Sequence, residues 1–219
     1  MPSKAYIQFL RNIETVSRLQ ETYEDAKKTR NKKGRGAFDH ITRSAILFLV
    51  SSFEVYCEDV IRACSELLIK NAKIADNLPN AVKNTINDYA LNISNCPPIK
   101  LCDDGWKTTY NRIVKEKTDA LNTPNKANLE KLFKSLIGFT TTDINNISDI
   151  GKIDEIIIFR GEITHRVRAK KYVHIEKVVE YRTIIEKVVV AIDKKLYNYI
   201  KNKYHKAPWK NTYKKVNID

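Results

Sequence analysis

The chain has 219 residues, which is enough for one domain with a sizeable core, alone or with an appendage. Its formal net charge of +13 favours a polyanionic partner such as RNA, DNA or an anionic membrane. Residues 1–11 lack the apolar core of a secretory signal, and no apolar stretch is long enough to span a bilayer. We therefore expect a cytoplasmic protein that has no membrane partner.

Helix breakers are scarce, with only 6 glycines and 6 prolines, while lysine, glutamate and leucine are frequent. This balance predicts an all-α fold built from long helices. We expect one helical domain over residues 1–205, with a helical insert over about 73–140 and a basic tail over 206–219.

Two long helices are expected first. Apolar residues recur at helical spacing over residues 3–29, so a helix is expected there with Ser3 as its cap. Residues 30–36 form a basic loop with two glycines, which is either solvated or a phosphate contact. A second helix over 38–71 has a wide apolar face, which is expected to bury Phe48 among others.

Shorter helices are expected in the middle of the chain. The pattern predicts one over residues 80–93, one from about 103 to 114, and an amphipathic one over 129–137 that ends at Gly138. Residues 140–151 have room for one further helical turn.

The final third is expected to hold two helices. The first covers residues 153–168, and a polar bend over 169–172 follows it. The last helix covers 174–205 and carries a continuous apolar stripe that suits packing against the second helix and against a partner subunit. The tail after residue 205 is expected to be loosely ordered.

The cysteines give no sign of a metal site. They are Cys57, Cys64, Cys96 and Cys102. The first two lie seven residues apart on the second expected helix and are typical of small core residues. No pair of cysteines or histidines has the spacing of a structural zinc site, so we expect reduced thiols, no metal and no cofactor.

The helix expected over residues 153–168 is mostly apolar, yet it contains Arg160 and His165. Charged and titratable residues are costly on a buried helix unless they are paired or used. A salt bridge and a satisfied histidine would explain them, but the two residues also suit work on a phosphate. Further positive charge follows directly, at Arg166, Arg168, Lys170 and Lys171.

Helical geometry limits how these residues can meet. Positions five apart differ by about 140° around the axis and about 7.5 Å along it, so Arg160 and His165 do not stack on one another. Gly161 lies one turn before His165 and leaves open space beneath it. Glu162 lies one turn before Arg166, and it could orient the imidazole of His165 or pair with Arg166.

Two motifs resemble those of a known family. Arg160-x-x-x-x-His165 follows an Ile/Phe-rich helix and precedes a long last helix, and Phe53-Glu54-x-Tyr56 lies on the second helix. In these features the chain resembles the HEPN superfamily of all-helical ribonucleases, and most of all its RiboL-PSP-HEPN type. The resemblance implies that Arg160 and His165 are the catalytic residues, contributed by both subunits of a homodimer to one cleft.

The chain departs from the family pattern at two positions. The family most often has a polar residue directly after the arginine, where this chain has Gly161. Toxin members that pair with a nucleotidyltransferase antitoxin often have tyrosine two residues after the histidine, where this chain has Val167. The second departure argues against that mode of control.

A second acidic feature lies on the second helix. Glu54 and Glu58 are four residues apart and share a face, so together they could hold Mg²⁺. No third acidic ligand recurs at a matching position, and the chemistry that the resemblance implies needs no metal. We interpret Glu54 as a buried partner of Arg160 or of Arg43.

The resemblance therefore implies a metal-independent endoribonuclease in a toxin or antiphage defence role. His165 would act as general acid and base, Arg160 would stabilise the phosphorane, and RNA and an antitoxin or defence protein would be its partners. A non-catalytic module that binds RNA or a nucleotide, or acts as a partner protein in such a system, is the alternative. The supporting site residues are Gly161, Glu162, Thr164 and Glu54, and the expected RNA contacts are Arg166, Arg168, Lys170 and Lys171.

Overall fold

The computed structural model describes residues 2–29, 38–92, 97, 101–165 and 172–213, with only the backbone described at His165. Within these ranges the chain forms eight α-helices, one 3-10 helix and no strand, which confirms the all-α prediction. No helix in this part of the chain is both long and apolar enough to cross a membrane.

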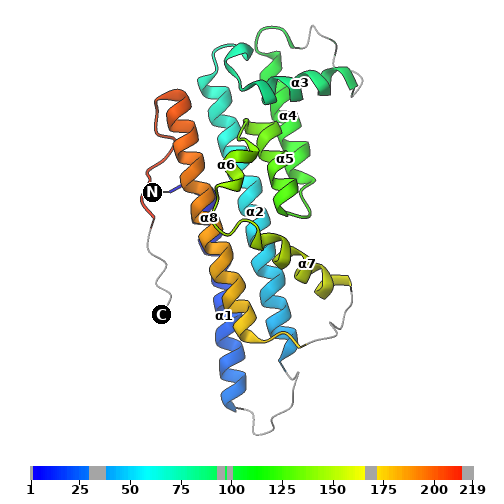
Figure 1. Cartoon of the computed structure of the whole chain (residues 1–219), viewed down its shortest axis with the longest axis vertical. Coiled ribbons are helices and arrows are strands. Elements are labelled where there is room, and N and C mark those ends of the chain that lie inside the picture. Colours follow the sequence, from blue (N-terminus) through cyan, green and yellow to red (C-terminus); the bar gives the residue numbers. More distant parts are fainter. Residues whose placement is uncertain (1, 30–37, 93–96, 98–100, 166–171, 214–219) are drawn as a thin grey trace.

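Three long helices form the frame of the molecule (Figure 1). They are α1 (Lys4–Thr29), α2 (Asp39–Asn71) and α8 (Ile175–Tyr204). In the view of Figure 1, α2 and α8 run upward side by side, and α1 runs in the opposite direction and packs against both. Their expected ranges were correct to within one or two residues, because a long apolar stripe at helical spacing identifies a helix well.

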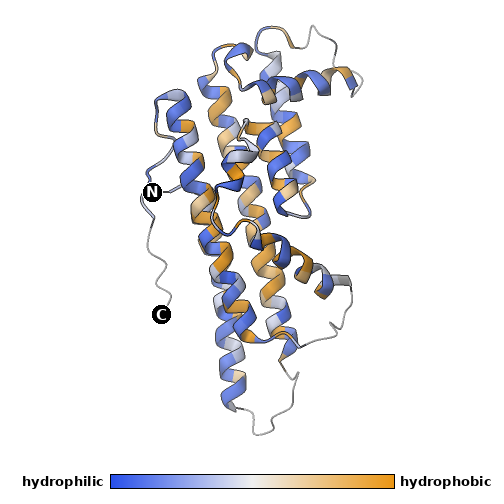
Figure 2. Cartoon of the chain, in the orientation of Figure 1, coloured by the Kyte–Doolittle hydropathy of each residue, from blue (hydrophilic) through white to orange (hydrophobic). Residues whose placement is uncertain are grey.

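The apolar side chains of the frame meet in one core, and Figure 2 shows them on the facing sides of the helices. Phe9, Phe53, Tyr56 and Val189 are among the side chains that are almost fully buried. Ser3 caps α1 as expected, since its hydroxyl accepts a hydrogen bond from the backbone N–H of Tyr6 at 3.0 Å.

Shorter helices lie beside the upper half of α2 in Figure 1, where α4 and α5 pack on α2 and α3 packs on α4 and α5. After the 3-10 turn Ala75–Asn77 come α3 (Asn80–Asn92), α4 (Gly105–Asp119) and α5 (Lys126–Ile137). The structure extends α4 to residue 119, five residues past its expected end, and Thr118 is fully buried there. Gly138 ends α5 in a left-handed conformation with φ of 72°, where a Cβ would also collide with Pro79.

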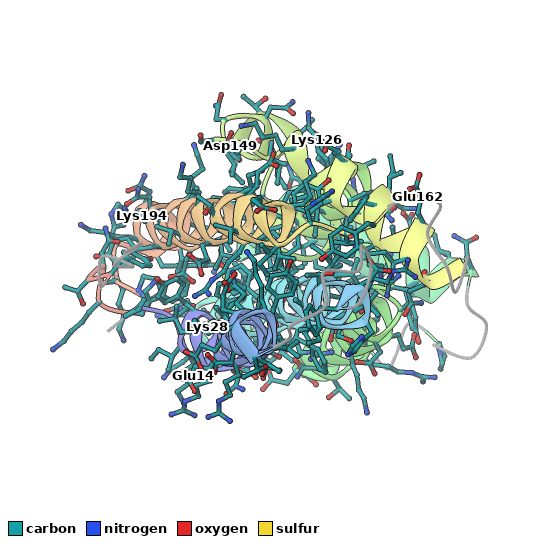
Figure 3. All side chains as sticks on the ribbon, turned by 90° about the horizontal axis from the view of Figure 1, so that it is seen from below. Glu14, Lys28, Lys126, Asp149, Glu162 and Lys194 are labelled. Carbon is teal, nitrogen blue, oxygen red and sulfur yellow. The ribbon has the colours of Figure 1, made fainter. Side chains whose placement is uncertain are left out.

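Two more helices lead into the candidate site. α6 (Thr141–Asn145) begins with a capping box, in which the side chains of Thr140 and Asp143 each accept a hydrogen bond from the backbone N–H of the other. α7 (Lys152–His165) then packs across α2 and α8. Figure 3, seen from below, shows α7 on the side of the molecule opposite α1, with α2 and α8 between them.

The start of the tail packs on the core, so the expectation of a loosely ordered tail is wrong for residues 206–213. Trp209 and Tyr213 are half-buried against the core, and the ring of Tyr213 meets Tyr6 edge-on at 5.3 Å between centroids. The hydroxyl of Tyr213 donates a hydrogen bond of 2.6 Å to Asp193, which is fully buried. The buried carboxylate of Asp193 gives Tyr213 a hydrogen-bond acceptor, which explains why the start of the tail packs on the core although its composition predicted a loosely ordered segment.

Asp193 also joins the two ends of the described chain. Its carboxylate accepts hydrogen bonds from the backbone N–H and the hydroxyl of Ser3 and from the hydroxyl of Tyr56. Burial raises the pKa of Asp193, and the hydrogen bonds from Ser3 and Tyr213 oppose that rise.

Replacing Asp193 with alanine is expected to lower the free energy of unfolding by about 2–4 kcal/mol, because several buried donors would lose their acceptor. Tyr213→Phe removes one donor only and should cost about 1 kcal/mol. Urea unfolding of the two variants measures both changes. Equal losses in the two variants would contradict the role of Asp193 as the common acceptor.

Candidate functional site

α7 is held against α8 by a small polar cluster at its first turns. The hydroxyl of Tyr181 donates to Glu155 at 2.9 Å, and the ammonium of Lys177 lies 3.2 Å from the same carboxylate and 4.4 Å from the centre of the Tyr181 ring. The ring of Phe159 packs edge-on against Tyr181 at 5.6 Å. These contacts hold the turn that precedes Arg160.

On the other side α7 rests on α2 through apolar side chains. Ile153 and Ile156 are fully buried, and Ile157 and Ile163 are nearly so. These apolar positions favour a helix that is buried on one side. The element that carries the Arg-x4-His motif is therefore braced by two long helices rather than placed on a loop.

Arg160 is half-buried on α7, and its charge acts on Glu54 of α2. Burial raises the pKa of Glu54, the positive charge of Arg160 lowers it, and the negative charge of Glu58 raises it again. Within the described residues, one oxygen of Glu54, Oε2, is buried and accepts no hydrogen bond. The charge of Arg160 on α7 thus reaches Glu54 on α2, two helices far apart in the sequence, without an ion pair between them among the described residues.

The other expected partners of this cluster are engaged elsewhere. Arg43 pairs with Asp39 at 2.5 Å, one turn away on its own helix. Glu58 pairs with Arg62 at 3.0 Å, which takes it out of a shared cation site with Glu54. No group of three or more histidine, cysteine or acidic side chains that could hold a metal occurs within the described ranges.

In the turn after Arg160, no atom of the described residues lies within 4 Å of the position that a Cβ of Gly161 would occupy, and the side chain of Glu162 is exposed. The hydroxyl of Thr164 is exposed too and donates back to the carbonyl oxygens of Gly161 at 3.0 Å and Arg160 at 3.3 Å.

Gly161→Ala is expected to raise the free energy of unfolding by about 0.5–1 kcal/mol, because glycine is unfavourable within a helix and the new methyl group would meet no atom of the described residues. Thermal unfolding followed by circular dichroism measures the change. The matched control is Gly138→Ala, which should destabilise the protein, since φ is positive there and Pro79 is in the way. A stability loss at Gly161 would show that the space beside it is filled.

His165 is the last residue of α7, and its side chain lies outside the described part of the structure. The expected RNA contacts lie outside the described residues as well; these are Arg166, Arg168, Lys170 and Lys171. The pairing of Glu162 with His165 or Arg166 therefore stays a prediction.

Sequence reasoning missed the exposure of three large apolar side chains on α2 and α7. Phe48, expected in the core, is 50% exposed, Val55 on the same face of α2 is 39% exposed, and Ile158 on α7 is 65% exposed. Most other large apolar side chains of these two helices are buried. No periodicity identifies the three in advance, because α2 is apolar around much of its circumference and buries only the part that α1, α7 and α8 cover.

The fold and the site together define a class. This is a helical-bundle protein that carries an arginine and a histidine five residues apart on a short helix braced between two long ones. The family model of RiboL-PSP-HEPN matches residues 8–198, from the first turns of α1 to the last turns of α8. The chain belongs to this HEPN-type family, and membership is consistent with a nuclease or another RNA-related module. No curated protein and no solved structure gives a significant match.

Proposed function

We propose that the protein is a metal-independent endoribonuclease that cuts RNA by attack of the 2′-hydroxyl on the adjacent phosphate, with a role as a toxin or in antiphage defence. The observation that carries the proposal is the half-buried Arg160, which lies on the helix that ends in His165 and whose positive charge acts on Glu54 of α2. Family membership supports it, because the matched range includes both residues of the Arg-x4-His motif.

The chemistry follows from the two residue types. RNA supplies its own nucleophile, so the protein must only remove the 2′ proton, protonate the leaving 5′ oxygen and stabilise the negative charge between these steps. An imidazole titrates near neutral pH and can do the proton transfers. The guanidinium of Arg160 stays charged and can bind two phosphate oxygens at once. The products would be a 2′,3′-cyclic phosphate and a 5′-hydroxyl end.

One imidazole is rarely enough for both proton transfers, and a two-fold dimer would supply the second. In such a dimer two copies of Arg160 and His165 would line one cleft, and each cut could use both copies. Exposed apolar residues on α2 and α7, Phe48, Val55 and Ile158, support a face that a second copy would cover.

The test is cleavage of single-stranded RNA by the purified protein in EDTA. The proposal predicts that cutting survives EDTA, that the ends are a cyclic or 3′-phosphate and a 5′-hydroxyl, and that DNA of the same sequence is untouched. A strict need for Mg²⁺, or a 5′-phosphate end, would contradict it.

Gly161 favours one other function in the same class of protein. Where the family most often has a polar residue after the arginine, this chain has a glycine with no described atom within 4 Å of its Cβ position. A module that binds RNA or a nucleotide without cutting it, or acts as a partner protein in a toxin–antitoxin or defence system, would fit that loss. It predicts RNA binding with a steep salt dependence and no cleavage under any condition.

A further inference from the structure

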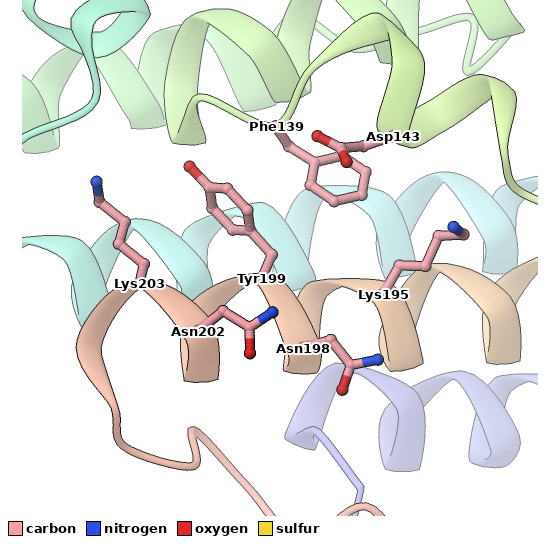
Figure 4. Close-up of a pocket in the computed structure, with 7 residues that line it drawn as sticks. All are labelled: Phe139, Asp143, Lys195, Asn198, Tyr199, Asn202 and Lys203. Atoms are coloured by element: carbon pink, nitrogen blue, oxygen red, sulfur yellow. The ribbon is translucent and has the colours of Figure 1, made fainter.

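A polar pocket lies on α8, toward the C-terminal end of this helix, where α8 faces the segment between α5 and α6. Its cavity of about 500 Å³ is within the range of small-ligand sites. Figure 4 shows Lys195, Tyr199 and Lys203 extending from α8 toward Phe139 and Asp143. Asn198 and Asn202 lie along the same helix on the outer rim.

The α8 residues of this pocket form one stripe of the helix. They are Lys195, Asn198, Tyr199, Asn202 and Lys203, a spacing that puts all five on neighbouring turns of one face. Eight residues separate the two lysines, which is about 12 Å along the axis. That span is long enough for the two lysines to reach different phosphates of one strand.

The wall of the pocket is rigid. The hydroxyl of Tyr199 donates to the carbonyl oxygen of Ile137 at 2.8 Å, and its ring meets that of Phe139 edge-on at 5.5 Å. Asp143, the acidic side chain of the pocket, is engaged at the start of α6, where its Oδ2 accepts from the backbone N–H of Thr140 at 2.9 Å. The carboxylate of Asp143 therefore caps α6 and does not pair with either lysine.

The two lysines have no carboxylate partner among the ion pairs of the described residues: the ammonium of Lys203 lies 5.7 Å from the centre of the Tyr204 ring, and neither lysine pairs within 4 Å. The surrounding sequence is strongly basic. Residues 194–213 contain six lysines and no acidic residue. Unpaired cations at both ends of a fixed pocket are suited to a chain of phosphates.

We propose that this pocket on α8 binds a single strand of RNA, with Lys195 and Lys203 on its phosphates and Asn198 and Asn202 on the ribose and base between them. An amide side chain both donates and accepts, which matches the 2′-hydroxyl and the base edges of RNA. A duplex keeps its base edges inside the helix, so the pocket suits an unpaired strand. The site is separate from Arg160 and His165 and does not depend on whether they cut RNA.

The experiment measures binding by the full chain to a fluorescent single-stranded RNA whose riboses are 2′-O-methylated, so that no 2′-hydroxyl can attack. Lys195→Gln with Lys203→Gln is expected to weaken binding about tenfold and to lower the slope of log affinity against log salt by about 1.4, from about 0.7 per lost phosphate contact. The matched control, Lys117→Gln with Lys131→Gln, removes the same charge from exposed positions on α4 and α5 and should change affinity less than twofold.

A second variant separates a pocket from a merely basic surface. Asn198→Ala with Asn202→Ala removes no charge, so it should weaken binding of unmodified RNA by about threefold with an unchanged salt slope, and should not weaken binding of DNA of the same sequence. Binding of unmodified RNA is measured with protein that also carries His165→Ala, so that the RNA is not cut.

Equal losses in the two lysine pairs would overturn the proposal, as would full displacement of the RNA by inorganic phosphate, a mononucleotide or an acidic peptide at similar concentration. If the pocket variants lose RNA binding and the wild type cuts no RNA, the proposed nuclease activity is contradicted but the RNA-binding pocket is not. Cleavage by the wild type with unchanged binding in the pocket variants would contradict this inference alone.

Discussion

His165→Ala is expected to lower the rate of RNA cleavage by about 10²–10⁴, the usual contribution of a general acid or base. Alanine keeps the helix but removes the one group on α7 that can gain and lose a proton near neutral pH. A gel assay on labelled RNA under single-turnover conditions measures the rate. His40→Ala, an exposed histidine at the start of α2, is the matched control and should cut like the wild type.

Arg160 provides the companion test of the same site. Arg160→Ala should also abolish cleavage, and the pKa of Glu54 should rise further, because the charge that lowers it is gone. Arg160→Lys keeps that charge but cannot bind two phosphate oxygens in one plane, so it should recover only part of the activity. Full activity in Arg160→Ala would show that the guanidinium has no role in the cleavage reaction.

The second large effect concerns the exposed apolar face of α2 and α7. Phe48→Glu and Ile158→Glu are each expected to convert a dimer into monomers and to lower cleavage at least about a hundredfold, because a buried carboxylate at an interface is strongly unfavourable. Sedimentation velocity measures the oligomeric state, and the RNA assay measures the rate in the same samples.

Leu91→Glu is the matched control for these variants, since Leu91 is 82% exposed and lies on α3. It should leave both the mass and the rate unchanged. Wild-type protein that sediments as a monomer and still cuts RNA would contradict a composite site, whatever the variants do.

The helices were predictable because each carries a strong local signal. Apolar stripes identified α1, α2 and α8, and Gly138 marked the end of α5 through its left-handed conformation. The end of α4 was not predictable in the same way. Its last turn is fixed by contacts far away in the sequence, where Arg62 of α2 reaches Thr118 at 3.0 Å and Asp119 at 2.7 Å.

The sequence proposed residues for the candidate site but said less about their surroundings. Local spacing pointed to Arg160 on α7 and suggested Glu54 as a partner, and in the structure the charge of Arg160 acts on Glu54. The catalytic role of Arg160 stays a prediction. The exposure of Phe48 and the docking of Tyr213 on Asp193 depend on which helix covers which face. Helical periodicity says that a face is apolar, but it does not say which element packs on it.

The most direct test of the proposed function uses an oligonucleotide that is 2′-O-methylated throughout except for one ribose. With EDTA present, the wild type should cut only after that ribose and leave a 2′,3′-cyclic phosphate, and neither His165→Ala nor Arg160→Ala should cut. Cleavage at methylated positions, or of an oligonucleotide that has no free 2′-hydroxyl, would contradict attack by the RNA's own hydroxyl.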